Sequence, residues 1–185
     1  MLSISANFGL LCEQGRWKVE FFLPTESTYD NTKSSGDRLI PLRSLVKERK
    51  ETVDPASLGN AQVNYLGLEH IQALTGELVG FSPRPATSIK SRSKIFRAGD
   101  VLYGRLRPNL NKVWLARGDV SEGICSTEFL VLVPIVEYIR PTVLRYLLSS
   151  HFVQRHAMRL QTGTALPRMN LSDLLDIEVP VPNIE

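Results

Sequence analysis

One hairpin-like segment of this 185-residue chain, GDVLYGRLRPNLNKVWLARG at positions 99–118, gathers side chains suited to contact with a polyanion. Six of them carry positive charge or an amide, and five of these on either side of Pro108 are candidate contacts: Arg105, Arg107, Asn109, Asn111 and Lys112. Arginine and lysine neutralise phosphates and can bond a guanine edge, and asparagine can make a paired bond with adenine. Pro108 fixes φ in the turn and so limits the entropy lost on binding. The competing interpretation is structural, because Arg105 or Asn109 can instead hydrogen-bond inside the turn.

Positive charge is unevenly distributed along the chain, although the formal net charge is only +3. Nine basic residues and one acid fall between positions 84 and 117, and five arginines and no acid fall between 140 and 168. A basic stripe of this kind favours a polyanion, most often nucleic acid, although solvated surfaces also carry local charge excess. If both windows serve one ligand, we expect them on one surface, where they form one positive concavity. The first window adds three candidate contacts: Lys90, Arg92 and Lys94.

Catalytic and metal-binding chemistry finds little support in the sequence. Methylation of an amino group would need an Asn/Asp-Pro-Pro-aromatic stretch and a glycine-rich cofactor loop, and neither is present. The ERK triplet at 48–50 has the Glu-x-Lys spacing of some metal-dependent nucleases, but no paired acid accompanies it. The three histidines lack the spacing of metal ligands. Cys12 and Cys125 lie far apart and are expected to be free thiols in a reducing cytosol. We therefore expect no catalytic residue, metal or cofactor.

Composition limits the class of protein. Hydrophobic residues are 43% and charged residues 22% of the chain, which fits one domain with its own core. No apolar run reaches the roughly 18 residues of a membrane span. A secretory signal peptide has positively charged residues before its apolar part, and the apolar N-terminal stretch of this sequence has none. A cytoplasmic protein without membrane contact is expected.

The elements that position these side chains are predicted to be mainly short strands. DVLYGRL and KVWLAR flank the Pro108–Asn109 turn, and ICSTEFLVLVP at 124–134 is the strongest strand run. Residues 25–37 are predicted to be a loop, and 38–51 a short strand or turn leading into a helical patch. In residues 61–78 the apolar positions alternate at first and then recur at helical spacing. Residues 80–94 are predicted to be an exposed basic loop.

The clearest predicted helix covers residues 140–161, with Pro141 in its first turn. Its broad apolar face is expected to pack on the core. Four residues form a basic face on the other side: Arg145, Arg155, His156 and Arg159. Further on, Asn170 is predicted to cap a short helix that has Asp173 near its start, and 177–181 alternates as a strand.

Together these pieces resemble a known family, the target-recognition domain of the specificity subunit of type I restriction–modification enzymes. The start RWKVEFFLP (16–24) is similar to that family's domain entrance. Four later segments match in order and spacing: YLGLEHI (65–71), FRAGDVLYGRLRPNLNKVWLA (96–116), GICSTEFLVLVP (123–134) and YLLSSHFVQRHAMRLQTGTALPRMNLSDLLDIEVPVPN (146–183). TGTALPRMNLSDLLDIEVPVP within the last segment is the most characteristic.

The resemblance implies a fold and a role. The fold is α+β (mixed α/β), a twisted β-sheet with flanking helices, in a single DNA target-recognition domain covering 1–185. The domain reads double-stranded DNA and directs a partner methyltransferase subunit and a restriction (helicase–nuclease) subunit, without catalytic residues of its own. With it, three residues of the most characteristic segment join the candidate DNA contacts: Thr162, Thr164 and Arg168.

The resemblance also bears on the STEF tetrapeptide at 126–129. Glutamate can accept from cytosine, and serine or threonine can bond most base edges. Because the tetrapeptide is shared across the family while DNA targets differ, a structural role is favoured. We expect Glu128 to orient Arg105 or Arg107, or to bond backbone amides nearby.

The chain departs from the family in holding one domain, without the long coiled-coil spacer helix that usually separates two such domains. It is expected to be an expressed fragment or a half-size relative. Three alternatives remain open: a protein-interaction or antirestriction relative that no longer reads DNA, the recognition domain of a single-chain DNA methyltransferase, and an RNA-binding domain. The last lacks the aromatic-rich strand signature of common RNA readers.

Overall fold

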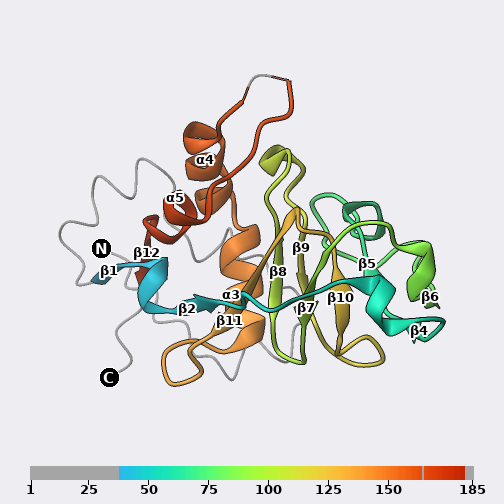
Figure 1. Ribbon diagram of the computed structural model, residues 1–185. Coiled ribbons are helices and arrows are strands. Elements are labelled where there is room, and N and C mark those ends of the chain that lie inside the picture. The colour runs from blue at the N-terminus through green and yellow to red at the C-terminus, as the bar shows by residue number, and fades with distance from the viewer. Residues whose placement is uncertain (1–37, 164, 182–185) are drawn as a thin grey trace. The chain divides into compact units, whose positions relative to one another are not determined.

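Two four-stranded sheets form the centre of the computed structural model, which describes residues 38–163 and 165–181 (Figure 1). The first sheet has the strand order β2-β11-β8-β9, with every neighbouring pair antiparallel. Its strands are Val46–Glu48 (β2), Phe129–Pro134 (β11), Val101–Gly104 (β8) and Val113–Leu115 (β9). The predicted hairpin on either side of Pro108 is confirmed as the β8–β9 pair.

The second sheet has the order β3-β7-β10-β5 and mixes directions, because β10 runs parallel to β5 and antiparallel to β7. Its strands are Thr52–Val53 (β3), Ser93–Phe96 (β7), Gly123–Cys125 (β10) and Tyr65–Leu66 (β5). Two small antiparallel ribbons complete the strands. They are β1 (Arg38–Pro41) with β12 (Glu178–Val181), and β4 (Gln62–Val63) with β6 (Arg84–Pro85).

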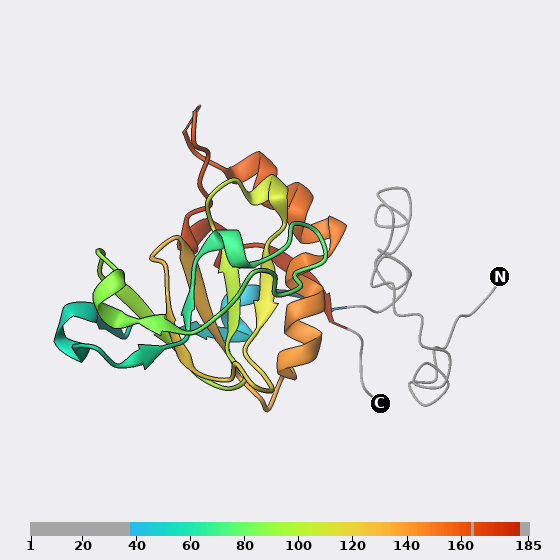
Figure 2. The same cartoon turned by 90° about the vertical axis from the view of Figure 1, so that its right-hand side faces the viewer.

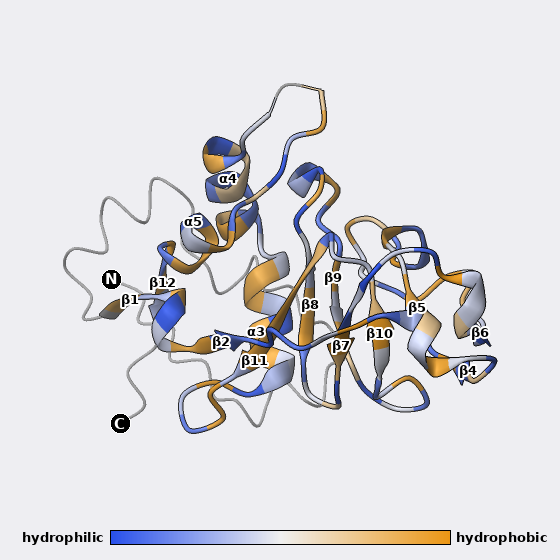
Figure 3. Ribbon diagram, viewed as in Figure 1, coloured by the Kyte–Doolittle hydropathy of each residue, from blue (hydrophilic) through white to orange (hydrophobic). Residues whose placement is uncertain are grey.

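A hydrophobic core joins the two sheets. The largest side chains in it include Phe96 from β7 and Trp114 from β9, whose rings meet edge to face with centroids 5.7 Å apart. All four residues of β8 are buried, because Leu102 belongs to the core cluster that contains Phe96 of the second sheet, and α3 packs against the strand. A strand covered on both faces needs an unbroken apolar sequence, which VLYG nearly is. Figure 3 shows the hydrophobic colouring concentrated on these central strands.

Among the described residues, three α-helices follow β11 in the sequence. α3 packs against β8, β9 and β11, and Figure 2 shows it beside the strands, with the β4–β6 ribbon projecting on the other side. The helices are Pro141–Ser149 (α3), His151–Leu160 (α4) and Leu171–Leu175 (α5). Five short 3-10 helices lie in the connections of the described part of the chain: Leu42–Ser44 (η3), Pro55–Leu58 (η4), Leu68–His70 (η5), Ala86–Ser88 (η6) and Pro108–Leu110 (η7). The predicted mixed fold, with a sheet and flanking helices, is confirmed.

The prediction of one continuous helix over 140–161 is wrong, because the helix is interrupted at Ser150. That residue has extended backbone (φ −65°, ψ 151°), and its hydroxyl accepts a hydrogen bond from Val153 N at 3.3 Å. Serine at a helix start satisfies a free backbone donor, so Ser150 begins a second helix rather than continuing the first. Arg145 therefore does not share a helix face with the basic residues of α4. Its guanidinium donates to the Thr75 carbonyl.

The apolar run predicted as one strand over 124–134 is divided between the two sheets. β10 ends at Cys125 and β11 begins at Phe129, with Ser126–Glu128 turning between them. The helical patches predicted within 38–51 and 61–78 are also wrong, since the structure has short strands and 3-10 turns there. The supposed loop at 80–94 contains β6, η6 and the start of β7.

Some predictions fall outside the described residues, namely the domain entrance at 16–24, the loop at 25–37, Cys12 and Thr164. In the described part, no helix has the length and apolar character needed to cross a bilayer.

Candidate nucleic-acid interface

The turn between β8 and β9 is held in an unusual backbone conformation. Arg107 (φ 50°) and Asn111 (φ 46°) are both left-handed and flank η7. For residues other than glycine this conformation costs about 1–3 kcal/mol, so the surroundings must impose it. Two main-chain bonds do so at Arg107: its N–H donates to the Pro167 carbonyl at 2.7 Å, and its carbonyl accepts from Leu110 N at 2.9 Å. The Arg107 side chain itself is exposed.

Two of the five predicted hairpin contacts are directed into the protein. Asn111 is buried, and its amide donates to the carbonyl of Ser149 at 2.7 Å, at the end of α3. The Lys112 ammonium donates to the Leu68 carbonyl at 2.6 Å. These side chains fasten the turn to its neighbours, so the structural interpretation holds for them. Asn109 keeps an exposed side chain, while its carbonyl accepts from Gln154 of α4 at 3.1 Å.

A second hairpin, formed by residues 162–168, lies against the end of β8. Thr162 and Arg168 exchange main-chain hydrogen bonds of 2.9 and 2.8 Å. Arg168 also pairs with Leu106, and the Arg105 carbonyl accepts from Met169 N at 2.9 Å. The most characteristic sequence segment is thus attached to the basic hairpin through its backbone.

Glu128 binds Arg168, and the predicted partnership with Arg105 or Arg107 is wrong. The Arg168 Nε lies 3.2 Å from both carboxylate oxygens, and Nη2 donates to Oε1 at 3.0 Å. These hydrogen bonds raise the pKa of Arg168. The side chains are 39% and 28% exposed, so the pair is open to a ligand. Sequence could not identify this partner, because 40 residues separate the two positions.

Three guanidinium groups therefore come from adjoining backbone: Arg105, Arg107 and Arg168. The Arg105 N–H donates to the Glu128 carbonyl at 2.9 Å, which joins the end of β8 to the Ser126–Glu128 turn. In the described part of the chain, Arg105 Nε is buried and has no hydrogen-bond partner. We call these three residues the arginine cluster. Among the described residues, the carboxylate of Glu128 is the one that binds within it.

The remaining candidates divide by exposure. Lys90 and Arg92 are exposed, and Arg92 Nε donates to Thr52 Oγ1 at 3.2 Å. Lys94 is only 14% exposed in its side chain and pairs with Glu48 at 3.1 Å, which fits an internal ion pair. Thr162 is exposed beside Arg168.

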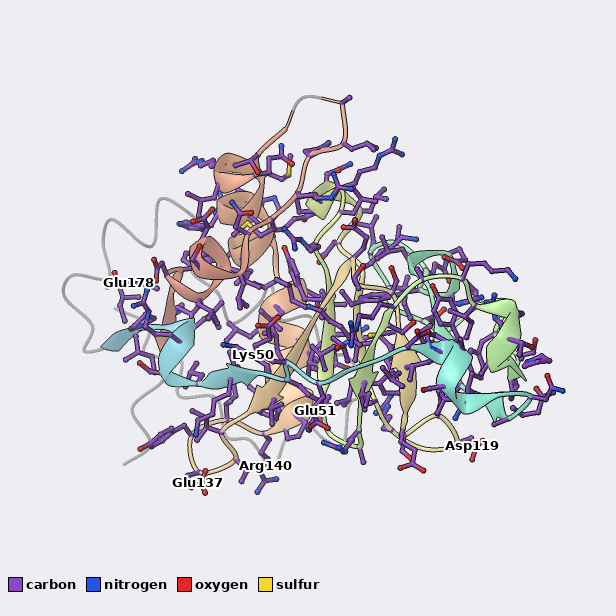
Figure 4. The ribbon with its side chains drawn as sticks, viewed as in Figure 1. Lys50, Glu51, Asp119, Glu137, Arg140 and Glu178 are labelled. Atoms are coloured by element: carbon purple, nitrogen blue, oxygen red, sulfur yellow. The ribbon has the colours of Figure 1, made fainter. Side chains whose placement is uncertain are left out.

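The basic residues of the two windows are spread over the molecule, and a single positive concavity shared by the two windows stays a prediction. Arg97 of the first window makes a two-pronged ion pair with Glu51, with both bonds 2.6 Å long. Figure 4 places Glu51 and Arg140 at the lower edge of the molecule, whereas the connection from α4 to α5 rises at the upper edge in Figure 1. Several basic residues thus belong to the opposite end of the molecule from the hairpin at 162–168.

Nucleophilic and metal chemistry gain no support from the described residues. Burial raises the pKa of the Cys125 thiol to about 12, so it stays protonated at neutral pH. No group of three His, Cys, Asp or Glu side chains in the described ranges is arranged to hold a metal ion.

Comparison with known proteins agrees with the geometry. No family model matches the chain. A curated relative, the EcoDI specificity subunit of a type I restriction enzyme from Escherichia coli, is 32% identical over 119 residues, which are 64% of this chain and 25% of the relative. The HsdS subunit from Thermoanaerobacter tengcongensis matches with a TM-score of 0.70 and 26% identity, over 80% of this chain and 38% of that one. The resemblance to type I specificity subunits is confirmed.

Two further solved structures support this resemblance. A chain from a study of type I R-M complex assembly and conformational transition matches with a TM-score of 0.71 and 27% identity, over 80% of this chain and 38% of that chain. The S subunit from M. genitalium, at 17% identity and a TM-score of 0.51 over 79% of this chain and 34% of that one, shares the fold. The chain spans a quarter of the curated specificity subunit and well under half of each solved one.

Proposed function

We propose that this chain is a sequence-specific DNA-binding domain that gives target specificity to a type I restriction–modification complex. The observation that carries the proposal is the arginine cluster, because Arg105, Arg107 and Arg168 stand on adjoining backbone segments that are held together by hydrogen bonds. Rigid backbone lowers the entropy lost on binding, and guanidinium groups can bond both phosphate and the guanine edge.

The left-handed Arg107 supports this assignment independently. Backbone strain of this kind concentrates at binding sites, where the surrounding structure maintains it. Here an extra hairpin, 162–168, contributes the acceptor at Pro167 that holds Arg107 in place. Asn109, Lys90, Arg92 and Thr162 are exposed and remain proposed secondary contacts.

We further propose that this domain has no catalytic activity of its own. A partner methyltransferase subunit and a restriction (helicase–nuclease) subunit would supply the reactions in the cytoplasm, and residues 1–185 would form one recognition domain. The similarity to specificity subunits supports this division of labour.

A second candidate function, protein binding without DNA reading, is favoured by one observation. Met158, Leu160 and Leu166 leave 42–45% of their surfaces exposed at the end of α4 and in the following hairpin. Scattered exposed apolar residues are ordinary, but three in one short segment suit a protein contact.

Selection from a random duplex pool tests DNA reading directly. The wild-type chain should enrich one sequence motif, and binding should be measured with that duplex, with single-stranded DNA and with RNA at two salt concentrations. Alanine at Arg105 or Arg107 should cost roughly 1–3 kcal/mol for the enriched duplex if that arginine contacts a base. If it contacts phosphate, all duplexes should weaken equally and the salt slope should fall by about one.

Arg140→Ala is the matched control, since Arg140 is exposed at the lower edge of the molecule and should leave both affinity and slope unchanged (Figure 4). Folding of every variant is checked by thermal melting. Failure of the wild-type chain to enrich any motif, or equal effects of Arg140→Ala and the cluster variants, would contradict the proposal.

A further inference from the structure

A second polar cluster, not predicted from the sequence, surrounds the buried histidine of η5. His70 is 8% exposed, and its Nδ1 lies 2.9 Å from the backbone N–H of Gly67. A backbone N–H can only donate, so Nδ1 must be the acceptor. His70 thereby occupies the role that Glu or Gln has in a capping box, returning to the backbone three residues earlier.

This bond fixes the proton on the other ring nitrogen. A neutral imidazole has one N–H and one acceptor, so Nδ1 as acceptor places the hydrogen on Nε2. Protonation of both nitrogens would set the Nδ1 hydrogen against the Gly67 N–H. Burial also disfavours the charged ring and lowers the pKa of His70. The ring is therefore neutral at physiological pH, and Nε2 is a hydrogen-bond donor.

The nearest group to Nε2 is another donor. Arg84 Nη2 lies 3.2 Å away, and arginine nitrogens cannot accept a hydrogen bond. Arg84 is held in this position by the Tyr65 ring, since its guanidinium carbon lies 4.7 Å from the ring centroid. Two N–H groups are thus fixed close together, and within the described residues neither has an acceptor oxygen at hydrogen-bonding distance.

Glu69 is the nearest carboxylate, but it stops short of this position. Its Oε1 lies 3.9 Å from His70 Nε2, beyond hydrogen-bond range, and its side chain is 66% exposed. The carboxyl group lies against Gly67 instead. Because this exposed carboxylate lies just beyond hydrogen-bond range, a small movement of the Glu69 side chain would let it compete with a ligand for the two donors.

We propose that His70 Nε2 and Arg84 Nη2 together bind one oxygen acceptor, a phosphate oxygen of the DNA backbone. Two donor nitrogens only 3.2 Å apart suit a single anionic oxygen, and charge-assisted bonds of this kind are strong. This inference rests on the proposed function and extends the interface beyond the arginine cluster. The two clusters are connected through the backbone next to Tyr65, because the Ser126 N–H donates to the Leu66 carbonyl at 2.9 Å and Ser126 Oγ accepts from the backbone N–H of Glu128.

The test uses the full chain and the duplex enriched in the selection, with a mixed-sequence duplex beside it. Arg84→Ala should weaken both duplexes equally and lower the salt slope by about one, as loss of one phosphate contact requires. Arg84→Lys keeps the charge but loses the planar fork, so it should recover the slope with lower affinity. Glu69→Gln should strengthen binding more than Asp119→Asn, a control at the lower right of Figure 4.

Nitrogen NMR of the histidine side chains adds a readout that does not depend on affinity. The free protein should show the Nε2–H tautomer at His70, and the Nε2 resonance should shift when DNA is added. An Nδ1–H tautomer, or an unchanged salt slope in Arg84→Ala, overturns the inference even if wild-type DNA binding is intact. Absence of wild-type DNA binding instead overturns the proposed function, and the phosphate site with it.

Discussion

At the scale of single residues, the two asparagines of the β8–β9 turn have opposite roles despite standing two positions apart. Asn109 is exposed, whereas Asn111 is buried with its amide bonded to Ser149. Asparagine tolerates the left-handed conformation at 111 better than most residues do. The same side-chain chemistry is therefore left exposed at one position and fastens the scaffold at the other.

Alanine substitution separates these roles. Asn111→Ala removes a buried hydrogen bond and leaves the Ser149 carbonyl without that donor, so the free energy of unfolding should fall by about 1–3 kcal/mol. Asn109→Ala should change it by less than about 0.5 kcal/mol, as exposed substitutions usually do. Urea unfolding measures both, and equal destabilisation by the two variants would contradict the assignment.

At the scale of elements, the break between α3 and α4 determines where the interface is anchored. The carbonyl of Ser149 accepts from Asn111, and Gln154 of α4 reaches the Asn109 carbonyl. One continuous helix would satisfy the Ser149 carbonyl internally, and the β8–β9 turn would lose that attachment. The cap at Ser150 is thus part of the site's support.

Ser150→Ala should cost about 1 kcal/mol of stability through loss of the α4 cap, and Ser150→Asp should retain most of it because aspartate also caps. Ser149→Ala is the neighbouring control. Its hydroxyl bonds only carbonyls of its own helix, so removal should change little. Thermal melting compares the three, and a Ser150→Ala variant as stable as Ser149→Ala would count against the cap.

At the scale of the whole molecule, some basic residues form structural ion pairs and others form the arginine cluster. Near the β7–β8 connection, Arg49 makes two hydrogen bonds to the buried Asp100, of 2.6 and 3.0 Å, and Arg97 binds Glu51. This ion-pair network joins the segment after β2 to the turn before β8. The basic residues there serve the fold, while the arginine cluster retains more positive than negative charge.

Acid titration should report this network. Hydrogen bonds from Arg97 and Arg49 lower the pKa of Glu51 from 4.5 to about 2. A lowered folded-state pKa contributes stability above the unfolded value, and this contribution is lost as pH falls from 4.5 toward 2. Glu51→Gln should therefore flatten that part of the stability curve, measured by urea unfolding across pH. The variant and the wild type should converge near pH 2, and parallel curves throughout would exclude the mechanism.

The sequence by itself determined the features that depend on local pattern and composition. Alternating apolar residues around a proline turn predicted the β8–β9 hairpin, and the segment order pointed to type I specificity subunits. Asn170 marked the start of α5, although its side chain makes no capping hydrogen bond and its amide donates to Asp173 instead. These signals depend on residues that are close in the sequence, so they can be interpreted without knowledge of the tertiary structure.

Only the tertiary structure decided which polar side chains are available. The Glu128 carboxylate binds Arg168, which lies 40 residues away in the sequence. The side chains of Asn111 and Lys112 bind backbone carbonyls inside the protein. Ser150 interrupts a helix that the apolar periodicity alone would extend. Such partners are set by which backbones come together in three dimensions, and similar sequence patterns are compatible with several pairings. The types of residue in the candidate surface could therefore be predicted from the sequence, but long-range packing and hydrogen bonding decide which of them are exposed.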